Sequence, residues 1–204
     1  MEQIHQRSFL LIISGPSGVG KGTILKYVEE KESDLWFSVS VTTRAPREGE
    51  IDGGHYHFIT EEKYNEMVEQ DAFLERADVH TARYGTPAKP IEEAIADHKI
   101  AILDIDTVGA ANVRKKRSDA VSVFILPPSW AELRQRLTSR GTETSEQVEK
   151  RLRNARNEVE RLSEYDYVIT NYSSVESAKQ LYAIIQAEKC RVLGSDYTVP
   201  EQNQ

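Results

Sequence analysis

The nine residues GPSGVGKGT, at positions 15–23, decide the fold. A glycine, any four residues and a Gly-Lys pair make the spacing of a phosphate-binding loop. The loop lies between an apolar run, Phe9 to Ser14, and a segment with apolar residues on one side, Thr23 to Lys31. In this strand–loop–helix context, glycines let backbone amides turn inward around phosphate oxygens, and the helix N-terminus adds its positive dipole end. The alternative, an ordinary glycine-rich turn, leaves the flanking strand and helix unexplained.

The lysine and the hydroxyl group of this loop predict how a nucleotide is held. Lys21 supplies a mobile cation for phosphate oxygens. Most loops of this kind place Ser or Thr directly after the lysine to contact Mg²⁺, whereas here Gly22 intervenes and the hydroxyl belongs to Thr23. We therefore expect Mg²⁺ to be held mainly by ATP oxygens and water, with Thr23 and a carboxylate in its outer shell. The loop residues expected to bind ATP are Gly15, Pro16, Ser17, Gly18, Val19, Gly20, Lys21, Gly22 and Thr23.

Composition and charge indicate a globular protein that binds small anions at local sites. The 204 residues are 39% hydrophobic and carry 33 acidic against 26 basic side chains, a formal net charge of −7. A pI near 5.4 argues against binding to nucleic acid. The longest apolar run is far shorter than the ~20 residues of a membrane span. Cys190 is the only cysteine, which excludes an internal disulfide, and we expect a cytoplasmic protein without membrane or nucleic-acid partners.

Further apolar runs alternate with helical stretches along the chain. They are Ile100 to Asp104, Val121 to Leu126 and Tyr167 to Thr170. Strands that alternate with helices predict a parallel α/β sheet.

Helix starts and one amphipathic segment add detail. Ser129 with Glu132, and Ser173 with Glu176, match the capping box, in which side chains at the first turn satisfy backbone amides reciprocally. From Ser145 to Leu162 apolar residues recur at intervals of three and four, which predicts a polar helix with one apolar stripe.

Between Phe37 and Pro90 the character of the sequence changes to short alternating stretches and turn residues. One short helix is predicted near Glu61 to Gln70. We interpret this region as a small lobe inserted into the sheet.

Two carboxylates follow the second predicted sheet strand. Asp104 and Asp106 lie at the carboxyl edge of the sheet, where open α/β sheets bind their ligands. Asp104 is the candidate for the water shell of the metal, and Asp106 is the candidate for a substrate contact. The alternative is that both carboxylates simply solvate the end of a strand.

Two arginines form a second candidate anion site. In Thr42-Thr43-Arg44-Ala45-Pro46-Arg47, two guanidinium groups lie three residues apart in a polar turn. Their forked donors suit a monophosphate, although a solvated arginine turn is the alternative.

These motifs together resemble guanylate kinase of the bacterial type. The segments GPSGVGKGT, FSVSVTTRAPREGEIDGGHYHF, FLE, YGT, ILDID, FILPPS and RLTSRGTET occur in that family's order and spacing, from about Phe9 to about Lys189. The resemblance implies an α/β fold of the P-loop NTPase type: a parallel sheet core flanked by helices, an inserted GMP-binding lobe and a helical lid. We expect the core at residues 1–36, 93–128 and 160–204, the lobe at 37–92 and the lid at 129–159.

The resemblance also implies an activity, MgATP plus GMP to ADP plus GDP, in purine nucleotide metabolism and GMP recycling. It assigns the GMP phosphate to Arg44, Arg47, Tyr56 and Tyr84, and the guanine base to Ser40, Glu75, Thr86 and Asp106. One carboxylate such as Glu75 can accept from both N1–H and N2–H₂ of guanine, while the hydroxyls of Ser40 and Thr86 can donate to O6. The residues implied in catalysis are Lys21, Arg44, Asp104 and the lid arginines Arg136, Arg140 and Arg151.

The chain departs from the family at the adenine end of ATP. The family commonly has an acidic pair where Asn171, an expected ATP-binding residue, is followed by Tyr172 and Ser173. A looser donor preference is therefore expected.

Two alternatives stay open beside this interpretation. A ribose bisphosphate kinase-like phosphoryl transferase has no use for guanine-reading groups. A catalytically silent guanylate-kinase-like binding module has no use for the intact phosphate loop. ATP and GMP are the expected partners, in a monomer or a small homo-oligomer.

Overall fold

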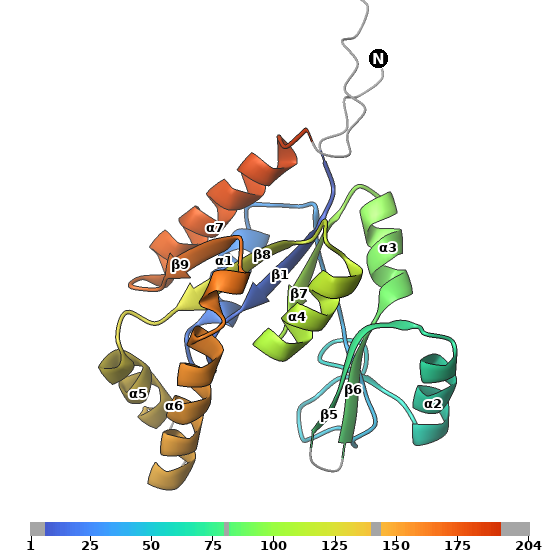
Figure 1. Cartoon of the computed structure of the whole chain (residues 1–204), viewed down its shortest axis with the longest axis horizontal. Coiled ribbons are helices and arrows are strands. Elements are labelled where there is room, and N and C mark those ends of the chain that lie inside the picture. Colours follow the sequence, from blue (N-terminus) through green and yellow to red (C-terminus); the bar gives the residue numbers. More distant parts are fainter. Residues whose placement is uncertain (1–6, 80–81, 140–143, 193–204) are drawn as a thin grey trace, which may run out of the picture.

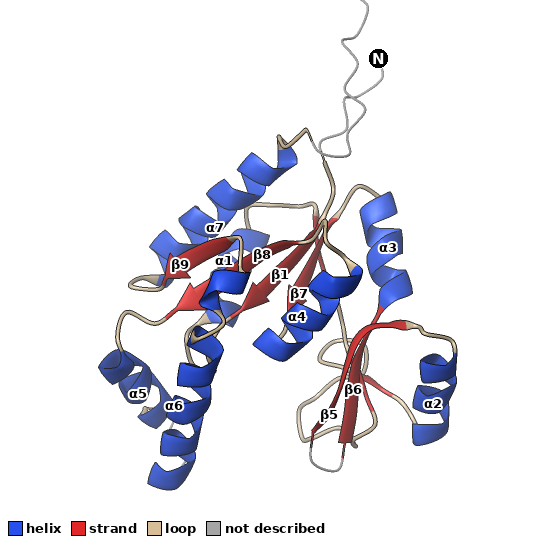
Figure 2. Ribbon diagram, in the orientation of Figure 1, coloured by secondary structure: helices blue, strands red, loops and turns tan. Residues whose placement is uncertain are grey.

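A computed structural model describes residues 7–79, 82–139 and 144–192 of the chain (Figures 1 and 2). Its elements are, in order, β1 (Leu10–Ser14), α1 (Lys21–Glu29), β2 (Leu35–Phe37), β3 (Val41–Thr42), β4 (His57–Phe58), α2 (Glu61–Glu69), β5 (Phe73–Val79), β6 (Ala82–Pro87), α3 (Ala88–Ala96), β7 (Ile100–Asp104), α4 (Thr107–Lys116), β8 (Val121–Leu126), α5 (Trp130–Thr138), α6 (Ser145–Val159), the short 3-10 helix η1 (Leu162–Glu164), β9 (Tyr167–Thr170) and α7 (Ser174–Lys189). Among these elements, no helix combines the length and apolar character that crossing a bilayer requires.

The main sheet has five strands in the order β2-β7-β1-β8-β9. Every neighbouring pair is parallel, with Ile12 of β1 opposite Leu103 of β7 and Ile13 opposite Val123 of β8. The parallel α/β sheet predicted from the sequence is confirmed. The sequence pattern missed β2, which has three half-buried residues and pairs only with β7.

Both faces of the sheet are covered, which explains why β1 is apolar at successive positions. Leu11 and Ile13 belong to the buried cluster that includes residues of α1 and α7. Leu10 and Ile12 belong to the opposite cluster, which includes residues of α3 and α4. In Figure 1, α1 and α7 accordingly lie on one side of the sheet, and α3 and α4 on the other.

A second sheet has four strands in the order β4-β3-β6-β5. In the sequence, all four lie between β2 and β7 of the main sheet. Its buried core is small: Val41, Tyr64 and Phe73. The side chain of Thr60 accepts a hydrogen bond from the backbone of Lys63 and so caps α2. Helix α3 starts directly after β6 and packs Ile91 into the core cluster of the main sheet.

Helices α5 and α6 pack on each other around a cluster of their own, made by Leu133, Leu137, Val148, Leu152 and Ala155. They extend from the same end of the main sheet as the second sheet does, with α4 between the two (Figure 1).

The two capping boxes predicted from the sequence are confirmed only in part. The Ser129 hydroxyl accepts from the backbone of Glu132, but the Glu132 carboxylate pairs with Arg136. Ser173 precedes α7 as predicted, yet its side chain makes no capping hydrogen bond, so that capping box is wrong. The pattern identifies residue types and not the rotamer that closes the box. Both halves of a capping box form instead at Thr144 and Gln147, at the start of α6.

Candidate active site

The phosphate loop lies between the end of β1 and the start of α1. Gly15 has φ +147° and a Cβ there would lie 2.3 Å from the carbonyl oxygen of Ile125, so only glycine fits. Gly20 has φ +102° and forms the N-cap of α1. The Lys21 Nζ donates to the carbonyl of Gly15 at 2.7 Å and lies 3.7 Å from Asp104 Oδ1. The lysine is thus folded back over the loop, beside the expected metal carboxylate.

The surroundings of Asp104 suit a divalent cation that takes most of its ligands from nucleotide phosphates and water. Burial raises the pKa of Asp104, while the neighbouring Lys21 lowers it. Thr23 is exposed at the start of α1, and a Cβ on Gly22 would meet open space. Within the described residues, no three His, Cys, Asp or Glu side chains gather in a metal-binding group. These donors suit an ion that is coordinated mainly by phosphate oxygens and water.

The loop is braced from behind by Asn171. This side chain is 1% exposed; its Nδ2 donates to the Val19 carbonyl at 2.7 Å, and its Oδ1 accepts from Ser177 at 3.0 Å. A Cβ on Gly20 would lie 2.7 Å from the same Nδ2. The amide nitrogen of Asn171 therefore holds the loop, while its oxygen anchors the side chain to α7.

Two of the three lid arginines contact the phosphate loop. Arg136 donates to the carbonyls of Val19 and Asn171, each at 3.1 Å. Arg151 of α6 donates to the Ser17 hydroxyl at 2.8 Å. Arg140 lies outside the described residues.

A carboxylate that the sequence reasoning missed lies on the same helix. Glu158 is two helical turns after Arg151, and the charges of both Lys21 and Asp106 act on it. Burial raises the pKa of Glu158, as does Asp106, whereas Lys21 lowers it. Its signal in the sequence was only its seven-residue spacing from Arg151.

The expected base-reading residues gather around Glu75. Thr86 is 0% exposed, and its hydroxyl donates to Glu75 Oε1 at 2.6 Å. The Ser40 hydroxyl oxygen lies 3.4 Å from the Thr86 hydroxyl oxygen. Thr86 was expected to donate to a base; here its proton goes to Glu75. Burial raises the pKa of Glu75, as does the charge of Asp106, and the Thr86 hydrogen bond lowers it.

Asp106 adjoins this group from the core. Its Oδ1 caps α4 by accepting from the backbone of Val108 at 2.9 Å and Gly109 at 2.8 Å. A Cβ on Gly109 would lie 3.3 Å from Glu75 Oε2 and 3.6 Å from Asp106 Oδ1, so the two carboxylates are neighbours across this glycine. The residue before Asp106 is tied to the end of β1, because the Ile105 carbonyl accepts from the Ser14 hydroxyl at 2.8 Å, so Asp106 lies between Glu75 and the start of the phosphate loop.

The expected phosphate clamp centres on Arg44. Its Nε donates to the hydroxyl of Tyr84 at 3.1 Å, and its guanidinium lies 5.2 Å from the ring centre of Tyr56. Its two terminal nitrogens donate to the carboxylate of Glu50 at 2.6 and 2.7 Å. The backbone amide of Arg47 also donates to Glu50, at 2.7 Å, while the Arg47 side chain is exposed.

Glu50 was missed in the sequence, although it lies only six residues after Arg44. The guanidinium hydrogen bonds, then the Arg47 amide, lower the pKa of Glu50 to about 2. The acid therefore carries a negative charge against the arginine fork, in the geometry in which a phosphate would bind.

Comparisons with known proteins agree with these observations. The guanylate kinase family model matches residues 7–188. The guanylate kinase of Clostridium perfringens (strain SM101 / Type A) is 46% identical over 94% of this chain and 90% of its own length. That of Caldanaerobacter subterraneus subsp. tengcongensis is 47% identical over 93% of this chain and 92% of its own. The crystal structure of guanylate kinase from Anaplasma phagocytophilum superposes with a TM-score of 0.71 at 32% identity, covering 92% of this chain and 89% of that one. The family match over residues 7–188 and these relatives, on a scaffold with an intact phosphate loop, show that the chain is an enzyme of the guanylate kinase family.

Proposed function

We propose that the chain transfers the terminal phosphoryl group of MgATP to GMP, giving ADP and GDP, as a step in purine nucleotide metabolism and GMP recycling. The observation that carries this proposal is the group formed by Glu75, Thr86 and Ser40 beside Asp106, which follows directly on the Ile105 contact with the end of β1, where the phosphate loop begins. It supplies acceptors for a guanine edge within the same site as a loop built for nucleotide phosphates.

Base recognition rests on the carboxylate of Glu75. Guanine presents N1–H and N2–H₂ side by side, and a carboxylate accepts from both. The hydrogen bond from Thr86 to Oε1 fixes the orientation of the carboxylate before a base arrives. The Ser40 hydroxyl, which lies 3.4 Å from that of Thr86, would turn from it to donate to O6. Adenine has neither N1–H nor N2–H₂, so it would leave the half-buried carboxylate without a partner from the base. Sites of this kind favour the correct base by about 10⁴-fold or more.

Phosphate recognition rests on Arg44 and its neighbours. An incoming GMP phosphate would replace Glu50 at the guanidinium fork, with the Tyr84 hydroxyl and the Arg47 side chain as further donors. Tyr56 packs against both the Arg44 guanidinium and the Tyr84 ring, which holds the fork in place.

Phosphoryl transfer in this site needs charge stabilisation and positioning more than proton transfer. A phosphate oxygen of GMP is already ionised at neutral pH, so no general base is required. Lys21, Arg136, Arg140 and Arg151 would neutralise the charge that develops on the transferring group. Mg²⁺, bound to the ATP oxygens with Thr23 and Asp104 near its water shell, would supply further neutralisation.

The decisive experiment is product identification from MgATP with GMP, IMP, AMP, UMP or ribose 1,5-bisphosphate as acceptor. GDP formed only with GMP supports the proposal. Product from the ribose phosphate instead of GMP would favour the related phosphoryl transferase. Nucleotide binding without any product would favour a silent binding module.

A further inference from the structure

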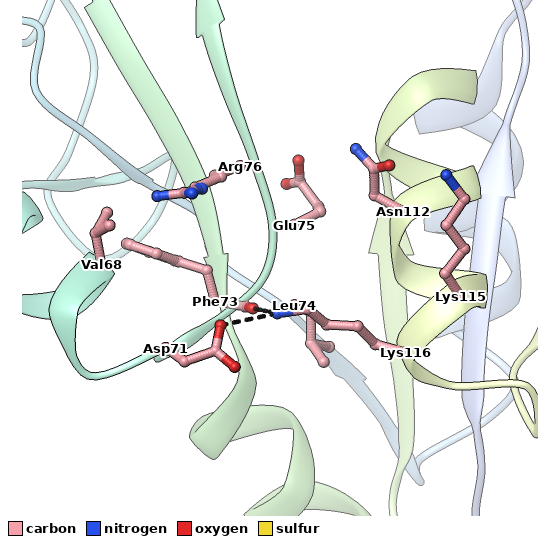
Figure 3. A pocket seen from close by; sticks show the side chains of 9 residues that line it. All are labelled: Val68, Asp71, Phe73, Leu74, Glu75, Arg76, Asn112, Lys115 and Lys116. Atoms are coloured by element: carbon pink, nitrogen blue, oxygen red, sulfur yellow. Dashed lines mark hydrogen bonds and ion pairs between the residues drawn. The ribbon is translucent and has the colours of Figure 1, made fainter.

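Helix α4 and the first residues of β5 meet where the lobe joins the core (Figure 3). Strand β5 lies at the edge of the second sheet, so its outward backbone groups have no neighbouring strand. Figure 3 shows Glu75 and Asn112 facing each other across this junction, with Lys115 and Lys116 along the same helix.

A β-bulge shapes the start of β5. Phe73 pairs with Pro87 of β6, but the next pair is Glu75 with Thr86, so Leu74 is an extra residue. Leu74 is 5% exposed and belongs to the core cluster that includes Ala110 and Val113 of α4. The bulge thus sends Leu74 into the core while it sets Glu75 opposite Thr86, its hydrogen-bond partner.

Lys116, the last residue of α4, reaches across to this bulge. Its Nζ donates to the Phe73 carbonyl at 2.8 Å and to Asp71 Oδ1 at 3.1 Å. The Asp71 side chain is 90% exposed, so that ion pair contributes little. The bond to Phe73 is partly buried and supplies a donor to a carbonyl at the open sheet edge, directly before the bulge.

We infer that Lys116 is a positioning residue for guanine recognition: by holding the Phe73 carbonyl it fixes the bulge, and the bulge fixes the carboxylate of Glu75. The inference rests on the proposed function and deepens it. Glu75 is held at one side by Thr86 and lies against Gly109 at the other, so a shift of β5 by a few tenths of an ångström changes both contacts.

A favourable charge at the C-terminal end of a helix is the competing explanation for this lysine. Lys115 provides the matched comparison, because it lies at the same helix end and lines the same junction. It donates no hydrogen bond to any residue in the described part of the chain, and its charge acts on Glu164. A dipole effect therefore predicts equal results for the two lysines, and the bulge contact predicts unequal ones.

The test compares Lys116→Met with Lys115→Met, using the full chain and steady-state kinetics with GMP, IMP and ATP. We expect Lys116→Met to raise the KM for GMP about tenfold, as loss of a charge-assisted hydrogen bond allows, and to reduce the GMP-over-IMP preference. The KM for ATP stays within about twofold of wild type, because the hydrogen bonds of Lys116 go to Asp71 and Phe73 of the lobe. Lys115→Met matches the wild type, and Lys116→Arg recovers most of the GMP affinity.

Two further variants separate the contacts and guard against misfolding. Asp71→Asn removes the ion pair at a left-handed position that Asn tolerates, and it should leave the KM for GMP unchanged. If Lys116→Met does not fold, Lys116→Gln, which keeps a donor without the charge, must fall between wild type and a tenfold loss. Wild-type GDP formation with equal kinetics for the two lysine variants would overturn this inference alone; no GDP from wild type would overturn the proposed function as well.

Discussion

Replacing Glu75 by glutamine removes one acceptor from the base-reading group with almost no change of shape. The Thr86 hydroxyl that donates to Oε1 can still donate to the amide oxygen, so the local packing remains. The amide nitrogen then faces the N2–H₂ of guanine, donor against donor. IMP lacks that amino group and keeps N1–H.

The expected magnitude follows from the two hydrogen bonds. A bond to a charged partner contributes about 1.5–3 kcal/mol and one between neutral groups about 0.5–1.5 kcal/mol, so losing the N2–H₂ bond and weakening the N1–H bond lowers kcat/KM for GMP by roughly 10²- to 10³-fold. IMP keeps the N1–H bond in its weaker neutral form, a loss of roughly tenfold. The GMP-over-IMP preference should therefore fall by roughly 10- to 10²-fold, with the KM for ATP unchanged.

The assay is coupled ADP release at fixed MgATP, with GMP and IMP varied separately. Glu69→Gln is the control, because that exposed acid lies on α2 in the same lobe and away from the base-reading group. Equal losses for GMP and IMP in Glu75→Gln would refute the assignment of Glu75 to the guanine edge, since they would place the defect in folding or in the phosphate clamp.

Three other changes test separate parts of the site. Arg44→Ala should weaken GMP, IMP and AMP by the same factor in acceptor kinetics, because its fork meets the phosphate that all three share; an effect confined to GMP would contradict the clamp. Gly20→Ala should cost about 2 kcal/mol or more of unfolding free energy in urea, because φ is +102° and the new Cβ would lie 2.7 Å from Asn171 Nδ2; an unchanged midpoint would show that the loop relaxes freely. The folded pKa of Glu50 is lowered to about 2 from 4.5, so its contribution to stability is present above pH 4.5 and is lost as pH falls toward 2. The melting temperature of the wild type should therefore fall more steeply between pH 4.5 and 2 than that of Glu50→Gln, which has no carboxylate to protonate. Equal falls in melting temperature would show that Arg44 does not hold the acid.

The main sheet was predictable because its signals are local. A strand, a glycine loop and a helix follow one another within 23 residues, and each apolar run is long enough to be buried on two faces. Strand β2 escaped because three half-buried residues give no periodicity. The Ser173 capping box failed because residue types match while the side chain turns elsewhere.

The missed residues of the site share a different physical cause. Glu158 takes its environment from Lys21 and Asp106, which lie far from it in sequence. Lys116 bonds a carbonyl 43 residues away, and at the end of α4 it is indistinguishable by pattern from a lysine that favours the helix dipole. Only the register of β5 and the position of α4 reveal that one of two adjacent lysines differs from the other.

Helix α4 connects the two halves of the proposed reaction through very few residues. Asp104, beside Lys21, and Asp106, at the cap of α4, are separated by Ile105 alone. From Gly109, which adjoins Glu75, to Lys116, which contacts Phe73, the helix advances about 10 Å. Glu75 thus has Gly109 of the core beside its carboxylate and Lys116 at the neighbouring bulge, whereas Arg44 bonds Tyr84 and Glu50 within the lobe. Glu75 bonds to Thr86 of β6, and Arg44 bonds to Tyr84 of the same strand, so the proposed base and phosphate contacts share one sheet. A sheet of this kind would carry the guanine edge and the phosphate of GMP as one unit beside the phosphate loop, which is the positioning that in-line transfer between two bound nucleotides requires.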